Sequence, residues 1–255
     1  SAGIPSWTVC ASLRSRSVIV RYFSYPALDR VELVSALALE AEDSLQLPRD
    51  QIAFDWHLNH QQRRAAQGDV ARDEGLLVAA PRKEVEGQLN VLRQAGLYPV
   101  AVDLGATAVG NLFQAMHPDP KSREDTCLLH LTSQSANIVL LFEGDSLYAR
   151  TIYARGENWE ASMGALFEGL QDALKFYVFK LRGQPVRRVV VSGRLPERAD
   201  ILNLLREKTG VPVEVWDPLT RVAPGSLRVS RLLRESSRPS LAVSMGLALR
   251  RYDGG

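Results

Sequence analysis

Few residues in this chain combine the side-chain types and the spacing that phosphate chemistry requires. The run Asp-Leu-Gly-Ala-Thr at 103–107 resembles a phosphate-binding turn, because a glycine lets backbone N–H groups approach an anion closely. A strand should follow such a turn, whereas residues 106–116 have the apolar periodicity of a helix. We therefore favour a capping role for Asp103, with anion binding at the helix N-terminus as the alternative.

The remaining candidates for chemistry are histidines and one serine. His57 and His60 are spaced as in some metal sites, but the stretch is polar and contains no Cys or third His, which favours solvated surface. His117 starts a loop and is expected to be solvated as well. His130 lies between two leucines, which favours a hydrogen-bonded core imidazole over a catalytic base. Ser192 lacks the G-x-S-x-G of a nucleophile elbow, so we expect no catalytic residue and no metal site.

The central third of the chain contains the clearest structural pattern. Residues 127–154 comprise three β-rich runs joined by very short polar links, which predicts an antiparallel meander. Residues 158–182 follow as a long amphipathic helix, and residues 188–192 as a buried strand. The predicted core stripe of this helix is Trp159, Met163, Leu166, Leu170, Leu174, Tyr177 and Leu181. A meander, a helix and a further strand are typical of one half of a ribonuclease-H-like α/β domain.

The N-terminal part contains two apolar runs followed by a helix signal. Residues 8–11 and 18–23 read as two strands separated by a basic, serine-rich turn. Asp29 with Glu32 three residues later is a capping-box pattern. It predicts a helix over residues 30–45, whose apolar residues recur at helical spacing.

Three polar or terminal segments complete the expected organisation. The polar stretch 59–75 lies between the predicted strands 52–56 and 76–80 and predicts a long hairpin loop. The basic stretch 220–239 has little core character and is expected to be a solvated linker. Ser240 is predicted to cap the final helix, whose small residues allow close packing.

Composition excludes several classes of function. The chain has 255 residues with a net charge of +2, and its basic residues are interleaved with acidic ones, so we expect no nucleic-acid partner. Its two cysteines lie in apolar runs and are expected to be reduced. No apolar run approaches the roughly 20 residues of a membrane helix, and no signal peptide is visible. The chain lacks an initiator Met, so we expect a further segment upstream.

Several short motifs, in this order, are similar to those of one family. They are LEAE at 39–42 before Leu-Pro at 47–48, LVAAPRKE at 77–84, AGLYPVAVD at 95–103, GVPVEVWDPL at 210–219, and AVSMGLALR at 242–250. Together they resemble the PilM family of type IV pilus assembly proteins, from about Thr8 to Tyr252. The resemblance implies an actin-like, two-lobed α/β fold with an inserted small α/β subdomain.

The resemblance also implies boundaries and a partner. The inserted subdomain would span residues 8–80, the rest of the first lobe 81–126, and the second lobe 127–252. The protein would be a cytoplasmic platform component, peripheral at the inner membrane, that binds other platform proteins and the cytoplasmic tail of a PilN-like membrane partner. The groove for that tail would lie beside the helix at 30–45. We select Pro26, Leu33 and Leu37 as residues that line or support this groove, and the oligomeric state, a homo-oligomer included, stays open.

The nucleotide loops of the family are altered in this chain. The second phosphate loop, D-I-G-A-S-x-T-N, corresponds to residues 130–137, so that His130 replaces Asp and Thr132 replaces Gly. The adenosine turn S-G-G-G corresponds to residues 192–195, where Arg194 replaces a glycine. The family's first phosphate loop would lie upstream of Ser1. Residues that could still contact a nucleotide are Ser133, Ser135, Asn137, Ser192 and Gly193.

These departures favour a non-enzymatic scaffold without a cofactor. One alternative is an actin-like ATPase or switch that binds ATP with magnesium. A second alternative is the cytoplasmic domain of a GspL-like type II secretion protein, which predicts a transmembrane helix beyond Gly255.

Overall fold

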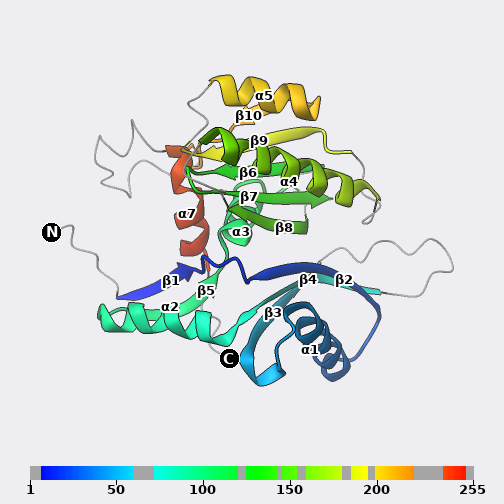
Figure 1. Cartoon of the computed structure of the whole chain (residues 1–255), viewed down its shortest axis with the longest axis vertical. Coiled ribbons are helices and arrows are strands. Elements are labelled where there is room, and N and C mark those ends of the chain that lie inside the picture. Colours follow the sequence, from blue (N-terminus) through cyan, green and yellow to red (C-terminus); the bar gives the residue numbers. More distant parts are fainter. Residues whose placement is uncertain are drawn as a thin grey trace. The chain divides into compact units, whose positions relative to one another are not determined.

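The computed structural model describes residues 7–59, 72–119, 125–142, 145–153, 159–179, 185–194, 199–220 and 238–250. It contains two compact units, one of residues 1–104 with 250–255, and one of residues 105–249. The subdomain boundaries inferred from the sequence stay a prediction, because they divide the chain by family resemblance and not by contacts. The two units are described separately below (Figure 1).

The first unit is built around a three-stranded antiparallel sheet. Its strands are β2 (Ile19–Pro26), β4 (Arg72–Pro81) and β3 (Ile52–Leu58), in the order β2-β4-β3. Helix α1 (Arg30–Leu45) packs against this sheet, and the short 3₁₀ helix η1 (Arg49–Gln51) precedes β3. The shared core consists of Phe23, Leu33, Leu37, Ala41, Ile52, Leu77 and Ala79.

Strand β4 starts earlier than the sequence indicated. Residues 72–75 were expected to belong to the polar loop, and that prediction is wrong. Two of their polar side chains bond to β2: Arg72 Nε donates to Ser24 Oγ at 2.8 Å, and Ser24 Oγ donates to Glu74 Oε1 at 3.0 Å. Residues 60–71, the rest of the predicted loop, and with them His60, lie outside the described residues.

The capping box at the start of α1 is confirmed. Asp29 Oδ1 accepts hydrogen bonds from the backbone N–H groups of Val31 and Glu32, at 2.8 and 2.9 Å. Glu32 Oε2 accepts in turn from the Asp29 N–H. Two N–H groups that have no partner inside the helix are therefore satisfied by the Asp29 carboxylate.

Removing this cap should destabilise the first unit measurably. We expect Asp29→Ala to lower the free energy of unfolding by about 1 to 2 kcal/mol, measured by urea denaturation. Ser35→Ala, an exposed change on the same helix that removes only a bond to the Val31 carbonyl, is the control and should change stability by less than about 0.5 kcal/mol. Equal stability of both variants would show that the cap contributes little.

The first unit also contains a two-stranded parallel sheet. Strand β1 (Thr8–Ser12) pairs with β5 (Tyr98–Asp103), and α2 (Arg82–Gln94) connects β4 to β5. The two N-terminal strands were predicted, but they do not pair with each other, since β2 belongs to the other sheet. Gly96 has φ +75° directly after α2, as expected for a helix that ends in the left-handed conformation.

The second unit contains the predicted meander. Strands β6 (Thr126–Leu131), β7 (Ser135–Phe142) and β8 (Asp145–Tyr153) pair antiparallel in sequence order. Strands β9 (Arg188–Gly193) and β10 (Val213–Val215) extend the sheet in parallel beyond β6, which gives the order β10-β9-β6-β7-β8. Helix α4 (Trp159–Phe179) connects β8 to β9, and α5 (Ala199–Thr209) connects β9 to β10.

Helices cover both faces of this five-stranded sheet. A Cβ on Gly110 of α3 (Gly105–Met116) would contact Val139, while one on Gly169 of α4 would meet Ile152, which pairs with Ala136. Since odd and even residues of β7 point to opposite faces, α3 and α4 lie on opposite faces. The predicted stripe of α4 is confirmed where it is described, with Met163, Leu166, Leu170 and Tyr177 buried and Leu174 partly so.

The final helix begins differently from the prediction. Residues Arg238–Leu241 form the 3₁₀ helix η3, and α7 (Ala242–Ala248) starts after Leu241 without a side-chain cap. Ser240 lies inside η3, so the predicted serine cap is wrong. The predicted close packing is confirmed, because a Cβ on Gly246 would lie only 1.9 Å from the carbonyl oxygen of Ala108 in α3. Residues 221–237 of the predicted linker lie outside the described residues.

Candidate functional site

The carboxyl ends of β6 and β9 are where the second unit should bind a ligand. The two strands are parallel neighbours, and the chain leaves them in opposite directions along the sheet, toward β7 and toward β10. Ligands of open α/β sheets bind at such a switch point. The five residues predicted to contact a nucleotide lie on the β6–β7 turn, the adjoining part of β7, or the end of β9: Ser133, Ser135, Asn137, Ser192 and Gly193.

The β6–β7 turn satisfies its own hydrogen-bonding groups. Thr132 Oγ1 accepts from the backbone N–H groups of Gln134 and Ser135, at 3.2 and 3.0 Å. The Thr132 N–H donates to the Ser135 carbonyl at 2.9 Å, and the two hydroxyls of Thr132 and Ser135 are 3.1 Å apart. A glycine at 132 would leave both N–H groups available to a phosphate. Among the five candidates, Ser133 is exposed in this turn.

A row of polar side chains crosses the sheet below this turn. Ser192, His130, Asn137 and Thr151 are register partners on four successive strands. His130 Nδ1 and Ser192 Oγ share a hydrogen bond of 2.9 Å, and Thr151 Oγ1 donates to Asn137 Oδ1 at 2.7 Å. The side chains of Ser192 and Asn137 are therefore both hydrogen-bonded to neighbouring strands. The row faces α3, since the Asn137 amide lies 3.0 Å from the position of a Cβ on Gly105.

His130 is a neutral core imidazole, as the sequence indicated. Its side chain is 3% exposed, and burial lowers its pKa to about 4, because a charged imidazolium is disfavoured away from water. The buried Cys127 thiol on the same strand is a poor nucleophile, because burial raises its pKa to about 12 and disfavours the thiolate. Within the described residues, no three His, Cys, Asp or Glu side chains gather into a group that could hold a metal ion.

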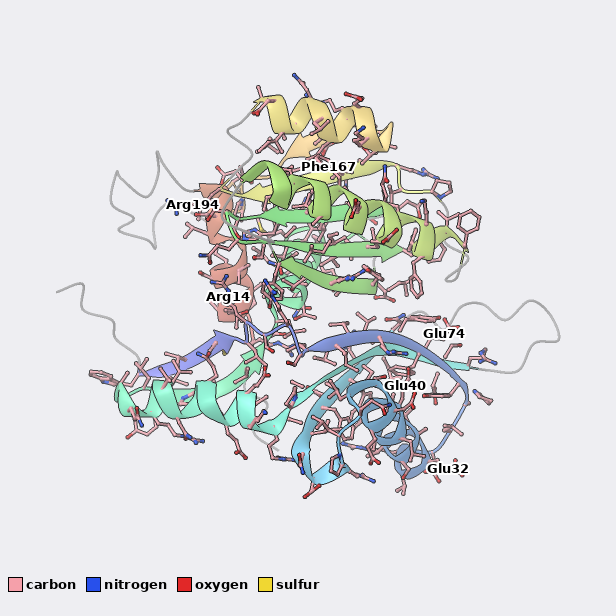
Figure 2. The ribbon with its side chains drawn as sticks, viewed as in Figure 1. Arg14, Glu32, Glu40, Glu74, Phe167 and Arg194 are labelled. Carbon is pink, nitrogen blue, oxygen red and sulfur yellow. The ribbon has the colours of Figure 1, made fainter. Side chains whose placement is uncertain are left out.

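Gly193 is required by packing of β9 on β6. It has φ +104°, and a Cβ there would lie 1.9 Å from the Leu131 carbonyl oxygen. The next residue, Arg194, donates its N–H to the same oxygen at 2.8 Å. Its side chain is exposed at the end of β9 (Figure 2). The glycine retained from the family motif therefore has a structural reason that does not involve a nucleotide.

The Asp-Leu-Gly-Ala-Thr run has a structural role in the first unit. Asp103 is buried, its Oδ1 accepts from the Leu104 N–H at 2.7 Å, and its Oδ2 pairs with Arg250 Nε at 2.7 Å. Helix α3 begins two residues later, as predicted. The Asp103 carboxylate is thus engaged by the Leu104 amide, which precedes α3, and by a guanidinium, which favours a structural role over phosphate binding. Capping of α3 itself stays a prediction.

The residues selected for tail binding differ in accessibility. Pro26 is exposed at the end of β2. Leu33 and Leu37 are 4% and 0% exposed and belong to the core under α1, so they can support a groove but cannot contact a partner. Two other apolar side chains of the same helix, Val31 and Leu39, are 76% and 66% exposed and lie away from the 33–37–41 core stripe.

Comparison with known proteins identifies a family and a fold. The model of a family described as type IV pilus assembly protein PilM matches residues 3–168. A chain of a solved PilM-PilN type IV pilus biogenesis complex has a TM-score of 0.74 and 22% identity, covering 96% of this chain and 80% of its own. This likeness, with the sheet order, confirms the predicted α/β, actin-like fold class. No curated protein sequence matches the chain.

Two further solved structures are more distant. One is a protein of unknown function with an actin-like ATPase fold from Bacteroides thetaiotaomicron, with a TM-score of 0.46, 11% identity, and coverage of 83% of this chain and 68% of that one. The other is the cytoplasmic domain of EpsL, an inner-membrane component of the Vibrio cholerae type II secretion system. It has a TM-score of 0.47 and 12% identity, and the match covers 74% of this chain and 62% of that one. No helix in the described parts of this chain is long and apolar enough to span a membrane.

Proposed function

The chain belongs to the family of the type IV pilus assembly protein PilM, and from that premise we propose that it is a non-enzymatic scaffold of the pilus assembly platform. It lies in the cytoplasm, peripheral to the inner membrane, and binds the cytoplasmic tail of a PilN-like membrane partner. The solved relative is a PilM-PilN complex, and nearly the whole of this chain matches the fold of one of its chains. That correspondence supports the choice of partner.

The observation that carries the non-enzymatic part is the closed β6–β7 turn. A phosphate bound there would need the N–H groups of Gln134 and Ser135, both of which donate to Thr132 Oγ1. Breaking each bond costs about 0.5–1.5 kcal/mol net before any phosphate contact forms. The family motif has Asp where His130 stands, and a neutral imidazole bonded to Ser192 cannot replace a carboxylate that orients metal-bound water.

The nucleotide part of the proposal is tested by isothermal titration of MgATP into the protein. We expect no detectable heat, and unchanged affinity for a synthetic peptide of the PilN-like tail when MgATP is present. Thr132→Gly frees two N–H groups and should gain measurable, weak binding of MgATP. Ser133→Ala, which removes an exposed hydroxyl from the same turn, is the matched control and should bind no better than the unaltered protein. Micromolar binding of MgATP by the unaltered chain would contradict the proposal and favour the switch alternative.

A further inference from the structure

The two units contain the same parallel pair of strands, each with a turn after its first strand. In the second unit β6 leads through a short turn to β7, and its parallel neighbour β9 follows helix α4. In the first unit β1 leads through residues 13–18 to β2, and its parallel neighbour β5 follows helix α2. The units differ in that β2 pairs with β4, whereas β7 pairs with β6. Strand β1 therefore corresponds to β6, and the turn after β1 corresponds to the β6–β7 turn.

A buried leucine at the end of each first strand aligns the two turns. Leu13 and Leu131 are 9% and 0% exposed. Each makes a backbone hydrogen bond of 2.8 Å to the end of the parallel neighbour: the Leu13 N–H donates to the Asp103 carbonyl oxygen, and the Leu131 carbonyl oxygen accepts from the Arg194 N–H. The residues before and after the two leucines can therefore be compared directly.

Aligned in this way, neither turn has the residues that open the family's phosphate loop, Asp-Ile-Gly. Ser12 stands at the Asp position of the first turn, as His130 does in the second. Arg14 stands at the Gly position of the first turn, as Thr132 does in the second. A hydroxyl or a neutral imidazole does not supply the carboxylate. A side chain at the Gly position hinders the close approach of backbone N–H groups to a phosphate.

Both turns are also closed by a hydroxyl that accepts a backbone N–H two residues later. Ser15 Oγ accepts from the Ser17 N–H at 2.9 Å, as Thr132 Oγ1 accepts from the Gln134 N–H at 3.2 Å. Such local bonds engage N–H groups that a phosphate loop would direct toward its ligand. Figure 2 shows Arg14 on the turn between β1 and β2. The turn after β1 is thus altered in both its motif residues and its hydrogen bonds.

We infer that the first phosphate loop of the actin-like fold lies inside this chain, at residues 12–17, and has lost nucleotide binding in the same way as the second. This replaces the position upstream of Ser1 that the sequence led us to expect. The inference rests on the non-enzymatic part of the proposed function and deepens it, because the loss of phosphate binding then involves a turn in each unit. The β6–β7 turn alone does not account for it.

The test is isothermal titration of MgATP into three variants of the full chain: Thr132→Gly, Thr132→Gly with Arg14→Gly, and Thr132→Gly with Arg16→Gly. Glycine at both aligned positions should tighten binding at least about tenfold relative to Thr132→Gly alone. One further hydrogen bond to a charged phosphate is enough for a change of that size. Arg16→Gly removes the same charge from the same turn but keeps the Arg14 side chain, so this control should bind no more tightly than Thr132→Gly.

The outcomes separate this inference from the proposed function. Equal affinity of the two double variants would overturn the assignment of residues 12–17 and leave the scaffold standing. Absence of binding by all three variants would also overturn it, because the missing glycines would then not be what prevents binding. Micromolar binding by the unaltered chain would contradict the non-enzymatic part of the proposed function together with this inference.

Folding of the variants is checked by their thermal unfolding midpoints. Arg14 and Arg16 are both exposed, so the midpoint of each double variant should equal that of Thr132→Gly. If a double variant unfolds earlier, Arg14→Gly and Arg16→Gly are compared with Thr132 unaltered. Arg14→Gly should then gain weak binding of MgATP and Arg16→Gly none, and equal results for the two would overturn the assignment.

Discussion

Gly246→Ala is expected to lower the free energy of unfolding of the second unit by about 3 kcal/mol or more. A Cβ at this position would stand 1.9 Å from the Ala108 carbonyl oxygen and 2.5 Å from its carbonyl carbon. Both are backbone atoms, so no side-chain rotation can make room. Helix α7 would have to move away from α3, and the contact between the two helices is the main one that α7 makes.

The effect is measured by urea denaturation, with Gly164→Ala as the matched control. Gly164 is also a helical glycine of the second unit, on α4, but a Cβ there would meet no atom within 4 Å. That substitution should stabilise the protein by about 0.5–1 kcal/mol, since glycine is a poor helix former. The two changes are chemically identical, so opposite signs would isolate the close approach of α7 to α3. Equal effects would show that α7 can shift without cost.

The elements best predicted from the sequence are those whose signals are local. The meander 127–154 has three apolar runs that are too short and too closely spaced for helices, and its strands formed as predicted. The Asp29–Glu32 capping box needs only residues three apart, and its two-way bonding is present. By contrast, the parallel partner of β1 is β5, about 90 residues later in the chain, and no local pattern indicates that pairing.

The candidate residues lie near one another at the β6–β7 turn and the end of β9, and their role in ligand binding stays a prediction. The hydrogen-bond partners of their side chains were not visible in the sequence. Ser135, Asn137 and Ser192 were treated as potential ligand contacts because of their type and motif position. Their actual partners are Thr132, Thr151 and His130, and the last bond joins residues 62 positions apart. Such cross-strand bonds depend on sheet register. The bonds that close the turn at Thr132 could have been predicted from the local sequence. A threonine hydroxyl commonly accepts hydrogen bonds from the N–H groups of the residues two and three positions later.

The row containing His130 leads to a second prediction with a large effect, on stability at acid pH. In the unfolded chain the imidazole has a pKa near 6.5, whereas burial lowers the pKa of His130 to about 4 in the folded protein. Between these values the unfolded state binds more protons, so stability must fall as pH falls. The contribution of neutral, buried His130 to the free energy of unfolding is fully present above about pH 6.5 and is lost progressively down to about pH 4. It amounts to about 2 kcal/mol between pH 7 and 5 and about 3 kcal/mol in all.

The prediction is checked by urea denaturation of the unaltered protein and His130→Asn at pH 7, 6 and 5. Asparagine can keep a hydrogen bond to Ser192 but cannot be protonated in this range. The variant is less stable at pH 7, and its stability should fall by about 2 kcal/mol less than that of the unaltered protein on going to pH 5. All other titrating groups are common to both proteins, so the difference in slope belongs to position 130. Parallel pH profiles would mean that His130 takes up a proton as readily in the folded state as in the unfolded state, so that burial does not lower its pKa.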